Sequence, residues 1–584
     1  MVDLPHATSA TAVMRGHALR TPDHTAIIFV DDVERADGAT RWSYARLDAE
    51  ATRIGAWLGA RYPVGTRALL LYPAGFDFAA AYLGCLYAGV AAVPAPLPGR
   101  YRHEQARVSG IAGNAAASVI LTDTESLPAV RAWTEAEKLT GTRVLATDGG
   151  DLPDPGAWTP LDADHRTLAM IQYTSGSTGD PKGVMVGHGS LLHNVDAQRR
   201  AFGLTAESRL GGWIPHYHDM GLLGQLLPAL LVGGTCVLMR PSAFLQRPHH
   251  WLRLIDTYDI QWSAAPNFAY EMCCARITDE QLAGLDLSRW RTASNGSERV
   301  DIATLDAFAK RFAPAGLRDD ALSPCYGMAE ATVFVSGEAD RKALVTTVDA
   351  EALTRHRFVP ADSGVDLVSC GTPRDYDVRI VDPLTGEQVP PAGIGEIWLR
   401  GPSLAEEYWN NPDATERAFM PDGFLRTGDL GTVHDGELYV TGRIQELLTV
   451  DGRRLYPQDV ERELRARHPE LGLAGAVFTV PMVELGIARA LVVAYEVQGR
   501  PAEERLRLLA EGIRRTVDRE FGVALGGTVL VRRGGIRRTT SGKIQRVETR
   551  RLFLNGGLEA LHADHAPGVE RALRSRRNAE RSGP

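Results

Sequence analysis

The sequence predicts an α/β fold: a large N-terminal domain of parallel-rich sheets and helices with a small β-barrel-like subdomain, then a small α+β C-terminal domain. Between residues 68 and 121, apolar β-rich runs alternate with helical patterns, which is typical of parallel sheets. From about residue 393 the pattern changes to short alternating segments, which are typical of hairpin strands. A further unit begins after residue 446. The 584 residues leave room for one large and at least one smaller domain.

The predicted elements follow this division. Pro457 lies near the first helical position of a pattern with acidic residues in its first turn, so a helix is expected to begin there. We place the N-terminal domain at 1–443, the C-terminal domain at 444–560 and an arginine-rich tail at 561–584, which its composition predicts to be solvated or frayed. Strands are expected at 68–72, 90–93, 118–121, 395–400, 431–433, 437–441, 477–480 and 491–495, and helices near 77–89, 457–467 and 502–521.

Composition excludes several classes of protein. The chain is 44% hydrophobic and 23% charged, and its 64 Lys and Arg against 72 Asp and Glu give a net charge of −8, so nothing points to nucleic acid. The six cysteines form no CxxC pair and no ligand-like cluster with histidine, so structural zinc is not expected and a reduced, cytoplasmic setting is favoured. Residues 1–25 lack the apolar core of a signal peptide. The apolar stretches 78–93 and 222–239 are shorter or more interrupted than a membrane span of about 20 residues, and are predicted as buried helix-then-strand pieces.

The stretch YTSGSTGDPKG, residues 173–183, follows an apolar run and holds three glycines, four aliphatic hydroxyls and a lysine. Glycines let the backbone approach an anion, and successive N–H groups can form a nest for phosphate oxygens. A flexible surface loop is the alternative, and there is no Walker A match. The fixed order of residues resembles the phosphate loop of the acyl-adenylate-forming superfamily, which includes acyl-CoA synthetases, luciferases and peptide-synthetase adenylation domains. The resemblance implies ATP contacts from Thr174, Ser175, Gly176, Ser177, Thr178, Gly179 and Lys182.

Five further motifs stand in the order that the superfamily shows. SNGSERV (294–300) resembles the adenine loop, CYGMAEAT (325–332) the adenine and magnesium motif, and RTGDLG (426–431) the ribose motif. TGRIQE (441–446) resembles the hinge motif and TTSGKIQR (539–546) the catalytic-lysine motif. The resemblance implies ATP or AMP binding by Asn295, Gly296, Ser297, Tyr326, Gly327, Met328, Asp429 and Arg443, Mg²⁺ binding by Glu330 and Thr174, and catalysis by Lys543, His218 and Glu330.

In the implied reaction, a carboxylate attacks the α-phosphate of ATP and pyrophosphate leaves. Both reactants are anions, so catalysis needs positioning and charge neutralisation, which Lys543 can supply by bridging carboxylate and phosphate oxygens. An exposed loop lysine is the alternative for Lys543.

The stretch GGWIPHYHDMGLLG (211–224) is similar to fatty acyl-AMP ligases, which pass their acyl-adenylate to an acyl carrier protein. His218 would lie at the mouth of the carboxylate site, although a core histidine is the alternative. Residues 336–369 resemble an insertion of these ligases, which would restrain the C-terminal domain and disfavour CoA chemistry. The resemblance also implies that this domain is mobile and rotates about residues 443–446 for the second half-reaction.

The substrate class follows in part from WSAAPNFAYEMCC (262–274), which has no acid before Glu271. Phe268, Tyr270 and Met272 are candidates for the wall of an alkyl tunnel, where each buried methylene is worth about 0.8 kcal/mol. Core packing explains them equally well. Arg299, where the family often has proline, and Gln445-Glu446 at the hinge are departures from the family pattern.

The stretch 531–551 holds eight cations, which either steer an acidic partner or form a solvated face. No carrier domain is visible, so a separate carrier protein with a phosphopantetheine arm is expected, as in lipopeptide or polyketide starter loading. Three hypotheses remain open: a fatty acyl-AMP ligase, a fatty acyl-CoA synthetase and a non-catalytic acyl-adenylate-binding protein.

Overall fold

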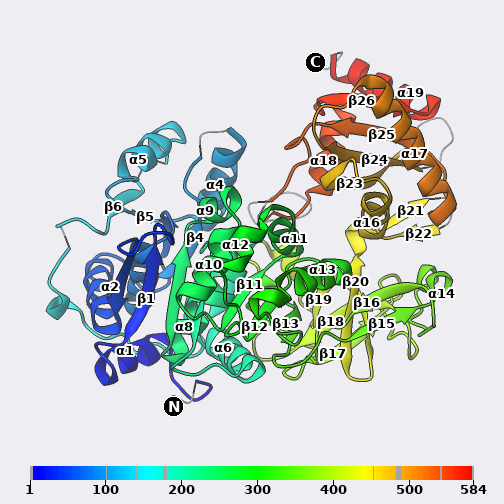
Figure 1. The fold of residues 1–584 in the computed structure, drawn as a ribbon. Coiled ribbons are helices and arrows are strands. Elements are labelled where there is room, and N and C mark those ends of the chain that lie inside the picture. The colour runs from blue at the N-terminus through cyan, green and yellow to red at the C-terminus, as the bar shows by residue number, and fades with distance from the viewer. Residues whose placement is uncertain are drawn as a thin grey trace.

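Figure 1 shows the computed structural model of the chain, in which a smaller C-terminal unit stands over one end of a large body. It describes residues 4–99, 102–139, 141–150, 152–174, 181–450, 453–481, 489–539 and 542–581. The body holds two large, mainly parallel sheets and smaller antiparallel ones, which confirms the predicted α/β class. Within these described ranges, no helix combines the length and apolarity needed to cross a membrane.

The first large sheet has eight strands in the order β14-β13-β12-β11-β9-β10-β1-β2. The pairs at its two edges, β13–β14 and β1–β2, are antiparallel, and all the pairs between them are parallel. Its strands are β1 (Thr25–Val30), β2 (Ala39–Ser43), β9 (Arg209–Gly212), β10 (Thr235–Met239), β11 (Trp262–Ala265), β12 (Thr292–Asn295), β13 (Leu322–Tyr326) and β14 (Ser336–Gly337).

The second large sheet has six strands in the order β6-β5-β3-β4-β7-β8, all parallel except for the edge pair β7–β8. Helices of the body pack on both sheets through one large apolar core, and α4 and α5 pack on the second sheet through a separate apolar cluster. The strands are β3 (Arg67–Leu71), β4 (Ala91–Ala95), β5 (Val119–Thr122), β6 (Arg143–Ala146), β7 (Leu168–Tyr173) and β8 (Gly183–Gly187).

The helices of the body begin and end at residues suited to these positions. Gly89 and Gly233 end α3 and α8 in the left-handed conformation, with φ of +66° and +89°. The chain can then turn directly into β4 and β10, so both apolar stretches are helix-then-strand pieces, as predicted. The helices are α1 (Ala10–Arg20), α2 (Tyr44–Gly59), α3 (Phe76–Ala88), α4 (Arg102–Ala115), α5 (Leu127–Ala136), α6 (His188–Phe202), α7 (Asp219–Gly221), the π-helix η2 (Leu222–Leu226), α8 (Leu227–Val232), α9 (Pro241–Gln246), α10 (His249–Thr257), α11 (Asn267–Arg276), α12 (Asp279–Ala283), α13 (Ile302–Phe312) and α15 (Pro412–Ala418).

The small subdomain is a four-stranded antiparallel sheet of β17 (Asp377–Val381), β18 (Gly395–Arg400), β19 (Leu425–His434) and β20 (Glu437–Arg443). It corresponds to the hairpin strands expected after residue 393. The insertion-like segment 336–369 adds the hairpin of β15 (Val345–Val348) and β16 (Val365–Val368), with α14 (Ala350–Thr354) between them. Val348, Leu353 and Leu367 of this segment share a core cluster with Tyr456, which lies beyond the hinge.

The C-terminal unit contains the sheet β23-β24-β25-β26, formed by β23 (Leu471–Pro481), β24 (Arg489–Val497), β25 (Leu525–Val531) and β26 (Ala560–His565). Around it lie the hairpin β21 (Leu448–Val450) and β22 (Arg453–Leu455), and the helices α16 (Pro457–Arg467), α17 (Glu503–Phe521), α18 (Arg546–Leu554) and α19 (Pro567–Arg581).

The prediction of a frayed tail is wrong. Strand β26 pairs with β25, and α19 follows it. Val569 and Leu573 stand one helical turn apart, and both are buried in the apolar cluster beneath the sheet. These two apolar side chains therefore anchor the arginine-rich helix α19. The overall composition of the stretch did not indicate this, because arginine dominates it.

Candidate active site

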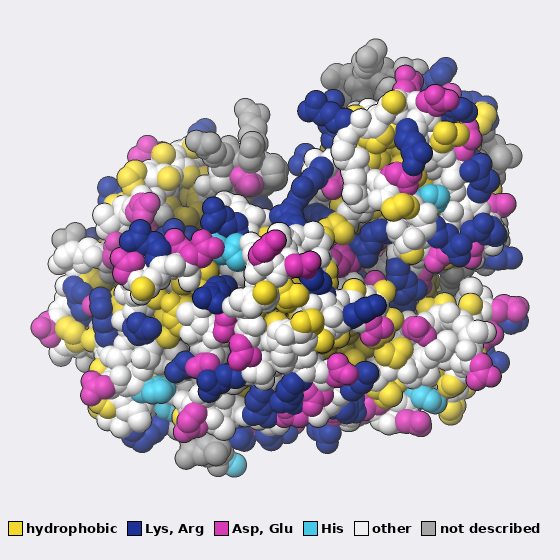
Figure 2. Space-filling view, viewed as in Figure 1, with side chains coloured by type: hydrophobic (Ala, Val, Ile, Leu, Met, Phe, Trp, Pro, Cys, Tyr) yellow, Lys and Arg dark blue, Asp and Glu magenta, His cyan; other side chains and the backbone are white. Residues whose placement is uncertain are grey.

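A cleft of about 2730 Å³ opens between the body and the C-terminal unit. Its walls come from the carboxyl ends of parallel strands in both large sheets, from the antiparallel sheet and from the loop that carries Lys543. This is the usual place for a ligand site in open α/β sheets. Figure 2 shows the hollow between the two parts, with Lys and Arg side chains along the facing side of the C-terminal unit.

Tyr326, Asp429 and Arg443 meet in the wall of this cleft. The Tyr326 hydroxyl donates to Asp429 Oδ2 at 2.7 Å, and Arg443 Nε lies 2.9 Å from Asp429 Oδ1. Asp429 and Arg443 face each other because they are paired in register on β19 and β20. The charge of Asp429 raises the pKa of Arg443, so its cation is permanent. Each carboxylate oxygen keeps a further lone pair, which suits a ligand with adjacent hydroxyls.

The predicted adenine loop divides into lining and supporting residues. Ser297 lines the cleft, in the left-handed conformation at φ +77°. Asn295 is fully buried and donates from Nδ2 to Asn267 Oδ1 at 2.9 Å. A Cβ on Gly296 would lie 2.7 Å from Cys325 Sγ, so only glycine fits there. Asn295 and Gly296 therefore support the conformation of this loop and do not line the cleft.

Glu330 is buried at the cleft wall in the short 3-10 helix Ala329–Ala331, next to the lining residues Gly327 and Met328. Its Oε1 accepts a hydrogen bond from the Tyr408 hydroxyl at 2.7 Å. Burial raises the pKa of Glu330, and the Tyr408 hydrogen bond partly offsets this effect. The charges of Arg443 and Lys182 also lower this pKa, but burial has the larger effect. Sequence reasoning missed the partner Tyr408 because no motif contains it.

The predicted phosphate loop lies between β7 and β8 in the sequence, and β8 contacts the short helix that holds Glu330. The Thr174 N–H donates to the Lys182 carbonyl at 3.0 Å, which closes the base of the loop, and both residues line the cleft. The Lys182 ammonium lies 4.8 Å from the centre of the Tyr408 ring. The predicted contacts Ser175, Gly176, Ser177, Thr178 and Gly179 lie outside the described residues.

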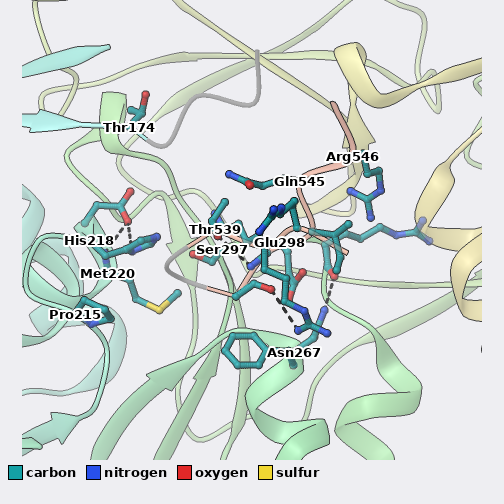
Figure 3. A pocket seen from close by; sticks show the side chains of 18 of the residues that line it. Thr174, Pro215, His218, Met220, Asn267, Ser297, Glu298, Thr539, Gln545 and Arg546 are labelled. Carbon is teal, nitrogen blue, oxygen red and sulfur yellow. Dashed lines mark hydrogen bonds and ion pairs between the residues drawn. The ribbon is translucent and has the colours of Figure 1, made fainter. Parts of the chain in front are cut away.

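Lys543 reaches into the cleft from the loop that follows β25. Its ammonium is in the electrostatic range of Asp219, Glu298, Asp429 and Arg443. Burial lowers the pKa of Lys543, and the Arg443 charge lowers it further, while the three carboxylates oppose this shift. Burial also raises the pKa of Glu298 to about 7, against the effect of Lys543. Figure 3 shows Glu298 beside Ser297 and Thr539, where the body and this loop meet.

His218 precedes the short helix α7, and its Nδ1 lies 2.8 Å from Asp219 Oδ1. The same carboxylate oxygen accepts a hydrogen bond from the Met220 N–H at 2.7 Å. Burial alone would raise the pKa of Asp219, but the charges of His218 and Lys543 lower it. Both residues line the cleft, so His218 is not a core histidine. Asp219 was missed, although it stands within the motif that predicted His218.

Two of the three residues predicted for the acyl wall line the cleft, and the third does not. Phe268 and Met272 lie one turn apart on α11 and face the cleft. Tyr270 is on the opposite side of the helix, fully buried, and donates its hydroxyl to the Ser294 carbonyl at 2.9 Å. Helical periodicity therefore removes Tyr270 from the wall. Trp213, which stacks on Phe244 with ring centres 4.0 Å apart, extends the apolar lining.

Ion pairs join the body to the C-terminal unit across the cleft. Arg299 Nη1 donates to Asp459 Oδ1 at 2.8 Å, and Arg465 binds both oxygens of Glu271 at 2.7 and 2.9 Å. The Arg299 and Asp459 side chains are only 9% and 14% exposed. The unusual Arg299 of the adenine loop thus has a role in joining the two parts. Glu446 at the hinge accepts from Arg546 Nη1 at 3.0 Å, within the C-terminal unit.

The loop that carries Lys543 also touches the apolar wall. Gly542 has φ +87°, and a Cβ built there would lie 2.1 Å from Cε1 of Phe268. The Arg538 guanidinium lies 5.9 Å from the centre of the same ring. The loop is therefore seated directly on Phe268.

Comparison with known proteins agrees with this geometry. Residues 14–409 match the family model described as AMP-binding enzyme. The chain is 41% identical to the medium-chain-fatty-acid–[acyl-carrier-protein] ligase JamA of Moorena producens, over 89% of this chain and 91% of the relative. It is 37% identical to the 4-hydroxyphenylalkanoate adenylyltransferase of Mycobacterium marinum, over 95% of this chain and 92% of the relative.

Among solved structures, a fatty acyl-adenylate ligase from L. pneumophila in complex with acyl adenylate and pyrophosphate matches with a TM-score of 0.73 and 33% identity. The match covers 97% of this chain and 99% of that one. The family resemblance predicted from the motifs is thereby confirmed. The chain belongs to the AMP-binding enzyme family.

Proposed function

We propose that this enzyme activates a fatty acid with ATP to acyl-AMP and then transfers the acyl group to the phosphopantetheine thiol of a separate acyl carrier protein. The observation that carries the proposal is the seating of Lys543 in one cleft between Asp429, which suits a ribose, and the apolar residues Phe268 and Met272. The similarity to JamA, an acyl-carrier-protein ligase, supports the acceptor. Lipopeptide or polyketide biosynthesis in the cytoplasm is the proposed setting.

In the first step, a carboxylate oxygen of the fatty acid forms a bond to the α-phosphorus of ATP. The bond from that phosphorus to the bridging oxygen breaks, and pyrophosphate leaves with the electron pair. Lys543 neutralises the two approaching anions, and Arg443 adds a second fixed cation. Tyr326 and Asp429 hold the nucleoside, so the reaction gains from positioning more than from proton transfer.

The residues present fit Mg²⁺, the metal that the family implies. Hard cations take carboxylate oxygens, and Glu330 offers a buried carboxylate with one hydrogen bond, from Tyr408, among the described residues. Thr174 lines the same part of the cleft and would be the second protein ligand. When bound, the ion would neutralise phosphate charge.

The second step needs the C-terminal unit to move, because Lys543 and its loop fill the cleft beside Phe268. We infer that the segment 336–369 restrains this movement, since its core cluster includes Tyr456 from beyond the hinge. This restraint favours a large carrier protein over free CoA as acceptor. The first alternative is a fatty acyl-CoA synthetase. The second, a non-catalytic binding protein, is disfavoured because Lys543 is present in the cleft together with the charged groups of Asp429 and Arg443.

Product analysis by mass spectrometry tests the proposal. The enzyme, ATP, Mg²⁺ and fatty acids from about C6 to C16, together with 4-hydroxyphenylalkanoates, are offered either CoA or a holo carrier protein; each methylene adds about 0.8 kcal/mol when buried. We expect acyl-AMP to accumulate with CoA and to disappear into acyl-carrier product. Rapid formation of acyl-CoA would instead support the synthetase alternative.

Arg299→Ala and Asp459→Ala are each expected to slow acyl-AMP formation about tenfold. Each leaves a partly buried charge unpaired and so weakens the closed arrangement that seats Lys543. The double variant is expected to be little slower than either single one, because the two residues act as a pair. Single-turnover rates give the measurement. The control is Arg318→Ala, which breaks an exposed pair with Asp320 on the body. If the rate of the double variant falls by the product of the two single effects, Arg299 and Asp459 do not act as a pair.

Gly542→Ala is expected to slow acyl-AMP formation about tenfold or more, because the added carbon drives the Lys543 loop away from Phe268. Gly534→Ala is a matched control, since Gly534 has a similar φ of +84° but open space around its Cβ position. Both variants carry the same backbone strain, so the difference in rate reports the contact. Equal rates in the two variants would show that the contact with Phe268 is unimportant.

A further inference from the structure

Away from the cleft, we propose that Glu34, His249 and His250 form a binding site for a divalent metal ion of the zinc class. Glu34 lies in the turn between β1 and β2, and the two histidines are the first residues of α10. One ligand atom from each of the three residues lies within 4.8 Å of the others. The site does not depend on the proposed reaction.

The distances suit tetrahedral coordination. His249 Nε2 lies 3.0 Å from Glu34 Oε1, and His250 Nε2 lies 3.5 Å from the same oxygen. Ligand atoms at about 2.1 Å from a tetrahedral zinc ion are about 3.4 Å apart, so only small shifts of the two histidines relative to Glu34 would be needed to admit the ion. Two imidazoles and one carboxylate form a donor set that zinc and cobalt accept, with a fourth position left for water.

The state of His250 is a second, independent observation. The residue is only 9% exposed, and beyond the 3.5 Å contact with Glu34 Oε1 its Nε2 forms no hydrogen bond within the described part of the chain. A buried nitrogen without a full hydrogen bond destabilises the folded state, and a bond to a metal ion would offset this cost. This nitrogen faces Glu34 Oε1, and the ring contacts that of His249 with centres 4.4 Å apart. The unpartnered atom is therefore aimed at the other two donors.

The surrounding charges leave this side of the carboxylate accessible. Arg247 Nη1 lies 3.6 Å from Glu34 Oε2, the oxygen that does not face the histidines. The Arg247 side chain is 63% exposed, so it can turn into solvent when an ion binds at Oε1. Asp31, in the same turn as Glu34, is occupied by Arg240 at 2.9 Å.

A metal ion here would fix one wall of the cleft. Helix α9 lies between Arg240 and α10, and its Phe244 stacks on the lining residue Trp213. The Asp31–Arg240 pair already ties the turn to the start of α9, and the ion would tie it just beyond the end of α9. The proposed role is therefore to hold the helix that supports the apolar lining.

The test uses the full-length protein freed of metal by a chelator. Zinc binding is measured by calorimetry, and Co²⁺ is added as a probe because its visible absorption reports tetrahedral coordination. We expect about one tight equivalent of zinc in the wild type. In Glu34→Gln and in His249→Gln the affinity should fall by more than the roughly 10–100-fold that loss of an outer-shell partner costs, because each variant removes a direct ligand. His434→Gln, a histidine on the antiparallel sheet, is the control and should bind as the wild type does.

The melting temperature gives a second readout. Zinc should raise it in the wild type and in His434→Gln, but not in the two ligand variants, because only an intact site couples binding to folding. Glu34 is half exposed, so its replacement leaves the fold intact. Absence of zinc binding in the wild type, or equal binding in all four proteins, would overturn the proposal.

Discussion

Lys543→Ala is expected to slow acyl-AMP formation on the order of 10²–10³-fold, the usual cost of losing one preorganised electrostatic donor. The ammonium lies among Asp219, Glu298 and Asp429, so the variant removes the positive charge on which the two anionic substrates converge. ATP binding should stay largely intact, because Tyr326, Asp429 and Arg443 do not depend on Lys543 for their contacts. Single-turnover rates and calorimetry with ATP measure the two effects separately.

The control for this variant is Lys310→Ala, which removes an exposed lysine of α13. It should leave both rate and affinity unchanged. An unchanged rate in Lys543→Ala would refute the proposed mechanism, whereas loss of ATP affinity equal to the loss of rate would assign Lys543 to binding alone.

The pH dependence of the rate follows from the lowered pKa of Lys543. The protonated form is the active one, so activity that depends on it is present at low pH and is lost as pH rises through this pKa. The loss should begin below the pH at which an exposed lysine titrates, because burial and Arg443 disfavour the charge. A pH–rate profile of the wild type measures this limb, and Lys543→Ala should lack it.

Glu330→Gln is expected to lower kcat on the order of 10²-fold and to raise the Mg²⁺ concentration that gives half the maximal rate. Glutamine has nearly the same shape, and its amide oxygen can still accept the Tyr408 hydroxyl. The variant thus removes the charge and keeps the packing. Initial rates over a range of Mg²⁺ concentrations, at saturating ATP, measure the shift.

Glu437→Gln is the matched control, because Glu437 is as buried as Glu330 but pairs with Arg341 outside the cleft. It should lower the melting temperature and leave the Mg²⁺ dependence unchanged. If Glu330→Gln shows the same Mg²⁺ dependence as the wild type, the Glu330 carboxylate does not bind Mg²⁺ and serves only to pack against its neighbours.

The alternation of strand and helix patterns and the order of the motifs predicted the fold class and most of the cleft. Motif residues such as Tyr326, Asp429 and Lys543 could be predicted because each carries its chemistry in a short local sequence. Tyr408 and Asp459 could not, since each meets its partner only after distant segments pack together. The Glu34–His249 contact spans 215 residues and left no local signal.

Other differences come from geometry that composition does not reveal. Tyr270 resembles its neighbours in the sequence, but the turn of α11 places it in the core. The arginine-rich stretch 569–584 was predicted to be solvated or frayed from its composition, whereas Val569 and Leu573 hold α19 against the core. Two apolar residues among many arginines change the composition little, so composition alone is a poor guide at such a helix.

The contact between Gly542 and Phe268 couples the fit of the fatty acid to the rate of acyl-AMP formation. Because the loop rests on this ring with no space for one more carbon, an acid that displaces Phe268 displaces Lys543 as well. An acid that fits poorly would then bind and dissociate without being converted to acyl-AMP, so no ATP would be cleaved. Discrimination among acids would show in the speed of activation more than in the strength of binding, and the enzyme would act as a kinetic filter.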